Sequence, residues 1–180
     1  MDRFSLDELL RHGYAGGILL LTLLYVYPTA RVTPLPGLDG TSSVAVGIGF
    51  VLLTGSVVYV FHRALLYRLL LYPLGLRLVW GRKRPDMIEI DLNRFVRRNA
   101  NESVQKYLLE WGSQVHFLYC SVWSISLGLS CGALMGWAVV PNRSCHVLCG
   151  AAILLIAAFA HHYFLLKYDR EIAMREPTNK

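Results

Sequence analysis

Six histidines are the residues of this chain whose side chains are best suited to chemistry, because imidazole binds transition metals and haem iron and titrates near neutral pH. Five of them lie close to the ends of apolar segments, toward one predicted side of a membrane: His12, His62, His116, His161 and His162. A b-type haem needs two facing imidazoles, for example His62 and His116. We expect interfacial side chains and no cofactor, with b-type haem or a transition metal as the alternative.

Three arginines form a second group with a defined chemistry. Arg94, Arg97 and Arg98 share one face if the residues from about Asp86 form a helix. Together they could hold a phosphate through charge-assisted hydrogen bonds. The expected ligand is the headgroup of an anionic lipid, and the alternatives are a phosphorylated ligand or an acidic cytoplasmic protein. No nucleic acid is expected, since no module that binds it accompanies the basic residues.

Small residues recur every four positions in one apolar segment, at Ser124, Gly128, Gly132 and Gly136. Such a ridge lets the backbone of another helix approach closely. The last apolar segment of the same chain, which carries Gly150, is the expected partner inside a bundle. Self-association through the same ridge is the second option, and both can hold together.

Motifs with an established catalytic chemistry are absent from the sequence: there is no P-loop, no His-Glu-x-x-His and no Gly-x-Ser-x-Gly. The four cysteines are expected to be small packing residues, and a Cys131–Cys149 disulfide is the alternative. The sequence therefore gives no reason to expect an enzyme.

The elements that must position these residues are four apolar segments, roughly 14–30, 42–61, 115–140 and 145–166. None of them contains an Asp, Glu, Lys or Arg. A hydrocarbon core of about 30 Å requires roughly 20 helical residues, which the last three segments supply and the first supplies with its apolar edges. The sequence predicts an all-α integral membrane protein with four transmembrane helices in two hairpins.

The basic residues predict the orientation of these helices. Sixteen of the eighteen Lys and Arg residues flank one side, and only Arg31 and Arg143 lie in the opposite loops. By the positive-inside rule, both termini and the long central loop are cytoplasmic. We expect the protein in the inner (cytoplasmic) membrane of a bacterium, in contact with anionic lipid headgroups.

The chain divides into four parts on this basis. They are a first hairpin with an N-terminal amphipathic helix (1–66), an interfacial helix with a basic cytoplasmic module (67–112), a second hairpin (113–167) and a cytoplasmic tail (168–180). The second span is expected to continue to about Leu71 and to bend at Pro73. Ser103 is expected to cap the helix before the third span, and a short turn at 141–144 to join the last two spans.

The predicted function is that of a non-enzymatic membrane protein that self-assembles. Its basic cytoplasmic module would receive a signal or partner, and its spans would act as a pore or membrane-perturbing effector of the toxin or phage-defence type. The alternatives are a redox or metal-binding protein that uses the histidines, and a scaffolding subunit of a membrane complex.

Overall fold

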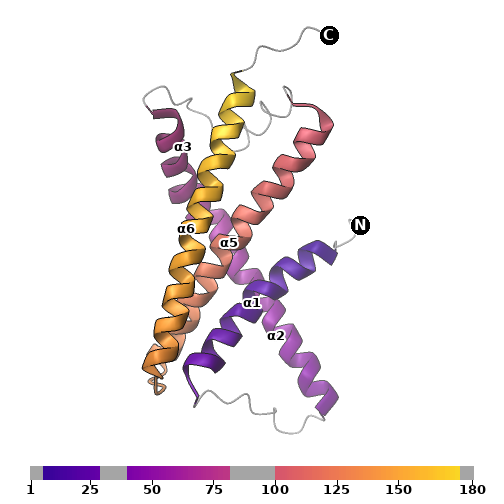
Figure 1. The fold of residues 1–180 in the computed structure, drawn as a ribbon. Coiled ribbons are helices and arrows are strands. Elements are labelled where there is room, and N and C mark those ends of the chain that lie inside the picture. Colours follow the sequence, from indigo (N-terminus) through magenta and orange to yellow (C-terminus); the bar gives the residue numbers. More distant parts are fainter. Residues whose placement is uncertain (1–5, 29–39, 82–99, 175–180) are drawn as a thin grey trace. The chain divides into compact units, whose positions relative to one another are not determined.

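A computed structural model of the chain describes residues 6–28, 40–81 and 100–174. Every regular element in these ranges is a helix, which confirms the all-α prediction for them (Figure 1). The elements are α1 (Leu6–Val26), α2 (Gly40–Phe61), the π-helix η1 (His62–Leu71), α3 (Tyr72–Trp80), α5 (Glu102–Leu134) and α6 (Pro141–Ala173).

Three helical stretches in the described ranges are long and apolar enough to cross a membrane: Gly40–Trp80, Glu102–Leu134 and Pro141–Ile172. The first of them comprises α2, η1 and α3 without interruption. The apolar part of α1, His12–Val26, is shorter than this length. The structure thus supports a membrane protein, with three helical stretches that could span the membrane and one shorter apolar helix.

The chain forms two compact units. Unit 1 contains Met1–His62 and Tyr119–Leu155, and unit 2 contains Arg63–Leu118 and Ile156–Lys180. The boundary falls inside three continuous helical stretches, so α5 and α6 each contribute residues to both units.

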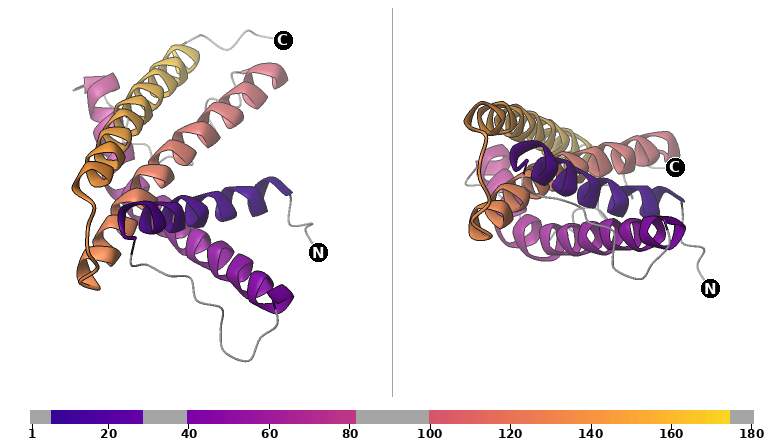
Figure 2. Two further views of the ribbon diagram at one scale, coloured as in Figure 1. Left: turned by 60° about the horizontal axis from the view of Figure 1, so that its bottom comes forward. Right: turned by 90° about the horizontal axis from the view of Figure 1, so that it is seen from below.

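In unit 1, α1 lies against α2, as both views of Figure 2 show. Gly16 and Gly55 form the point of closest approach. A Cβ atom at Gly16 would collide with the carbonyl of Val51, and one at Gly55 with the carbonyl of His12. The two backbones therefore touch directly, which only glycine allows. An apolar cluster of Ala15, Leu19, Val58 and Cys120 packs beside this crossing.

The connection from α5 to α6 also lies in unit 1. Gly136 has a φ of 66°, its N–H bonds to the carbonyl of Ala133, and the N–H of Trp137 bonds to the carbonyl of Gly132. This is the Schellman arrangement that ends a helix. Residues 141–144, predicted as the turn, instead form the first turn of α6. Pro141 starts that helix, where a missing N–H costs nothing.

The start of α5, in unit 2, differs from the prediction by two residues. The side chain of Asn101 accepts a hydrogen bond from the N–H of Val104 at 2.9 Å and so caps the helix. Ser103, the predicted cap, lies inside the first turn. Asparagine and serine are equally good caps, so the spacing of apolar residues alone did not distinguish the two positions.

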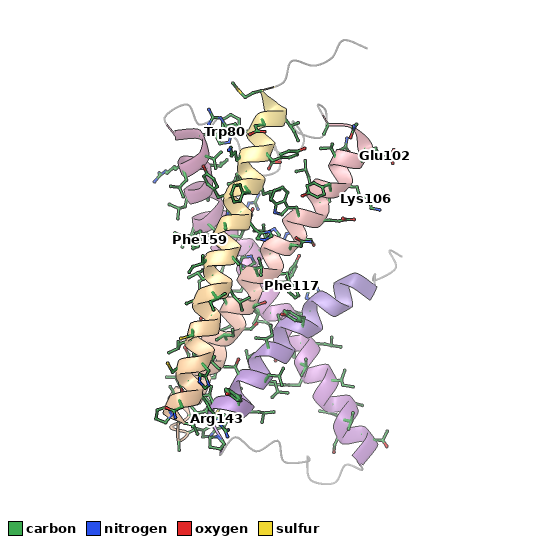
Figure 3. The ribbon with its side chains drawn as sticks, in the orientation of Figure 1. Trp80, Glu102, Lys106, Phe117, Arg143 and Phe159 are labelled. Atoms are coloured by element: carbon green, nitrogen blue, oxygen red, sulfur yellow. The ribbon has the colours of Figure 1, made fainter. Side chains whose placement is uncertain are left out.

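In unit 2, α3 packs on the C-terminal part of α6. Arg170 of α6 donates a hydrogen bond to the carbonyl of Val79 at 2.8 Å. Its guanidinium carbon also lies 5.7 Å from the ring centre of Trp80, which Figure 3 labels at the end of α3. Arg170 thus satisfies a carbonyl at the end of α3 and covers its last aromatic side chain.

The helix around Pro73, where the sequence predicts a bend, changes its hydrogen-bonding pattern. The helix continues through Pro73 to Trp80, and the ten residues before α3 are π-helical. Pro73 lies in the first turn of α3 and cannot donate a backbone hydrogen bond. Wider π turns are one way for a helix to absorb such a break, and they change which residues share a face.

Candidate functional site

Tyr67 is the centre of a polar aromatic cluster in unit 2. Its hydroxyl lies 3.3 Å from Nε2 of His162, and its ring lies 4.3 Å from the ring of His116, edge to face. Tyr67 and His162 are 4 % and 2 % exposed. The three side chains come from η1, α6 and α5, so the cluster joins three helices of unit 2. We call these three residues the Tyr67 cluster.

The fourth helix of unit 2 completes the surroundings of the Tyr67 cluster. A Cβ atom at Gly75 of α3 would lie 3.0 Å from Cε1 of His162 and 2.6 Å from Cδ1 of Leu166. The absence of a side chain at Gly75 therefore leaves the space that the imidazole occupies. Tyr72, also on α3, places its ring 6.0 Å from that of Tyr67.

A phenol hydroxyl and an imidazole in hydrogen-bonding distance can exchange a proton or orient a polar ligand. The direction of the bond between Tyr67 Oη and His162 Nε2 depends on the tautomer of the imidazole. Metal binding is a different matter. In the part of the chain that the structure describes, no three His, Cys, Asp or Glu side chains lie together so that they could hold an ion.

The remaining predicted histidines contact aromatic rings. In unit 1, His12 lies edge to face with Tyr59 at 5.0 Å, and the buried His62 lies 5.6 Å from Tyr119. In unit 2, His161 is exposed. The ring centres of His161 and Trp111 lie 6.4 Å apart in an edge-to-face arrangement. Imidazole therefore pairs with aromatic side chains at all five positions.

The small-residue ridge of α5 packs against α1, rather than against the last apolar segment that the sequence favoured. A Cβ at Gly128 would lie 3.0 Å from Cβ of Thr22. A Cβ at Gly132 would enter the ring of Tyr27, whose hydroxyl donates a hydrogen bond of 2.5 Å to the carbonyl of Leu129.

The other ridge residues have different surroundings. Ser124 is completely buried in unit 1, and no described residue hydrogen-bonds its hydroxyl. Gly136 terminates α5. Gly150 has no atom within 4 Å of the position where a Cβ would be. The close approach that the spacing predicts is therefore carried by Gly128 and Gly132.

Two residues of these sites were not identified from the sequence. Tyr27 follows the last residue of α1, and Tyr67 lies within a run of leucines. Tyr67 lies in the π-helix η1, whose wider turns do not follow the 3.6-residue period used to read apolar faces from a sequence. The pattern of apolar residues therefore contained no signal for its burial. The predicted phosphate-binding residues Arg94, Arg97 and Arg98 lie outside the described residues.

Known proteins give no further information on this site. No protein family model, no curated protein and no solved structure matches the chain.

Proposed function

We propose that the protein is a non-enzymatic membrane protein that assembles with further copies of itself, and that unit 2 receives a ligand or partner. Four helices would cross the membrane in two hairpins, with both termini in the cytoplasm of a bacterial cell. On assembly, the spans would form a pore or otherwise perturb the membrane.

The observation that carries the proposal is the exposure of the membrane-length helices. In the most apolar 18-residue segment of Gly40–Trp80, only 11 % of the segment is buried inside the structure. The corresponding shares are 6 % for Pro141–Ile172 and 44 % for α5. The first and last of these stretches therefore expose apolar side chains along most of their length. Lipid covers such surfaces in a monomer, and other copies of the chain cover part of them in an assembly.

Unit 2 has the charge expected of a receiving module. It contains fourteen of the eighteen Lys and Arg residues of the chain. An excess of basic residues attracts phosphorylated or acidic ligands. Arg94, Arg97 and Arg98 remain our proposed contacts to a phosphate group.

The continuity of the helices supports coupling between ligand and membrane. The stretch Gly40–Trp80 and the helices α5 and α6 each run from unit 1 into unit 2. A ligand that rotates or shifts these helices in unit 2 would act on residues of the same helices in unit 1. The Tyr67 cluster joins three of the helical segments concerned, and it is where such a shift would be resisted.

The test is to reconstitute the purified protein in liposomes that contain a fluorescent dye, and to measure its oligomeric mass in nanodiscs. We expect a discrete oligomer and dye release. A protein that stays monomeric and leaves both the dye and the membrane potential of expressing cells intact would contradict the proposal.

The same sample tests the alternatives. A Soret band or one bound transition metal per chain would favour a redox or metal-binding protein that uses the histidines. Co-purification with one fixed partner, without leakage, would favour a scaffolding subunit. A colourless and metal-free oligomer that releases the dye would support the effector function.

A further inference from the structure

We infer that the outer surface of η1 and α3 binds the headgroups of anionic phospholipids. The surface combines a stripe of exposed leucines with exposed arginines, and it is distinct from the three arginines beyond residue 81. We call it the Leu–Arg surface.

The apolar part of the Leu–Arg surface follows the helix for its whole length. Its exposed leucines are Leu65, Leu69, Leu70, Leu74 and Leu78, with exposed fractions between 42 % and 70 %. The opposite face of the same helices is buried in unit 2 through Tyr67, Leu71, Tyr72, Leu76 and Val79. Because one face already packs on the protein, the leucines must contact something else.

The charges of the Leu–Arg surface identify its occupant. Arg63, Arg68 and Arg77 are exposed along the same helices, and the sequence contains no Asp or Glu from Gly40 to Gly81. Two such surfaces would repel each other if two copies of the chain met there. An anionic membrane surface instead satisfies both components, because leucines enter the acyl region while guanidinium groups reach the phosphates.

Chain length also favours a membrane surface. The stretch Gly40–Trp80 contains 41 residues, which corresponds to about 60 Å along its path, whereas the bilayer with its headgroups is about 40–45 Å thick. Part of this stretch cannot lie in the hydrocarbon core along the membrane normal. A segment that follows the interface places both leucines and arginines at suitable depths.

The full-length protein in detergent is supplied with phosphatidylglycerol and phosphatidylcholine in equal amounts. Native mass spectrometry then measures which of the two lipids the protein retains. We expect the wild type to retain phosphatidylglycerol preferentially. Replacement of one arginine, Arg68→Gln, is expected to lower this preference about fivefold, the factor typical of one basic residue at an anionic surface.

Lys106→Gln is the matched control, since Lys106 is an exposed basic residue of α5 in the same unit (Figure 3). It removes the same charge outside the Leu–Arg surface and should leave the lipid preference unchanged. Circular dichroism of each variant checks that the helices persist.

Two outcomes would overturn the inference. Equal retention of both lipids by the wild type would show that the Leu–Arg surface does not prefer anionic lipids. An equal loss in Arg68→Gln and Lys106→Gln would assign the preference to overall charge.

Discussion

Tyr67 is the residue of unit 2 whose hydroxyl links η1 to α6. Tyr67→Phe keeps the ring against His116 and removes the hydroxyl that lies 3.3 Å from Nε2 of His162. Because a buried imidazole then loses a partner, we expect the free energy of unfolding to fall by about 1–2 kcal/mol. Thermal unfolding of the detergent-purified protein, followed by circular dichroism, measures the change as a lower midpoint.

The control for this substitution is Tyr107→Phe. Tyr107 is 54 % exposed, so the loss of its hydroxyl should leave the midpoint unchanged. If Tyr67→Phe and Tyr107→Phe unfold alike, the Tyr67 hydroxyl does not stabilise unit 2, and the Tyr67 cluster is held by ring packing alone.

The sequence predicted interfacial side chains for the five histidines but no partners for them, and His62 and His162 are in fact buried. Imidazole is amphipathic, which places it near the ends of apolar helices whatever it contacts. Its contact depends on the side chain that an adjacent helix brings to the same place, and that depends on helix register. For His162 the partner is Tyr67 of a π-helix, whose register no α-helical period anticipates.

At the scale of helices, the crossing of α1 and α2 depends on Gly55. A methyl group there would meet the carbonyl of His12, which belongs to helical backbone and cannot rotate away. We therefore expect Gly55→Ala to separate the two helices and to cost about 1–3 kcal/mol, as overpacking does in protein cores. The midpoint of thermal unfolding in detergent is again the measurement.

Gly49→Ala on the same helix separates this effect from helix propensity. No atom lies within 4 Å of a Cβ at Gly49, so alanine should be neutral or slightly stabilising there. A result in which both variants are equally stable would mean that α1 and α2 do not touch at Gly55.

The ridge of α5 leads to a second prediction about helix packing. Gly132→Leu must displace the ring of Tyr27 from its place against α5, and we expect a loss of about 1–3 kcal/mol in unfolding free energy or a failure to assemble. Gly150→Leu adds the same side chain to α6 where no atom lies within 4 Å, and it should be tolerated. Size-exclusion profiles and unfolding midpoints of both variants, measured together, decide the question. Tolerance of both leucines would show that Tyr27 yields without cost.

The helices themselves were largely predictable from the sequence. Long runs without charge required helices because an unpaired backbone cannot be buried in lipid. The details at helix ends were not predictable in the same way. Gly136 was assigned to the packing ridge by its spacing, but its positive φ ends α5, and the turn therefore precedes Pro141. Spacing alone does not distinguish a glycine that admits another helix from one that terminates its own.

For the whole molecule, the number of spans depends on whether α1 crosses the membrane. The helix Leu6–Val26 has 21 residues, or about 31 Å, close to the thickness of the hydrocarbon core. Its apolar part, His12–Val26, is shorter. Length alone therefore leaves three or four spans.

The contacts at the end of α1 favour four spans. The carbonyl of Val26 accepts a hydrogen bond of 3.2 Å from the N–H of Val140, and the side chain of Arg143 donates one of 3.2 Å to the carbonyl of Tyr25. Val140 lies in the connection between α5 and α6, and Arg143 lies in the first turn of α6. The C-terminal end of α1 therefore lies beside the chain segment that leads from α5 into α6, and we expect α1 to cross the core from there.

We accordingly expect both termini on the same side, in the cytoplasm. Epitope tags at the two ends should resist protease in intact spheroplasts, and both should be cleaved in inverted membrane vesicles. An N-terminal tag that is cleaved in spheroplasts while the C-terminal tag is protected would reduce the number of spans to three.

A three-span result would also place Arg3 and Arg11 outside the cell, against the charge asymmetry of the remaining chain. Because α1 contacts both α2 and α5 inside unit 1, it would then have to lie within the membrane without crossing it. That arrangement would leave the N–H groups at its start unsatisfied in lipid, which is why we expect the four-span result.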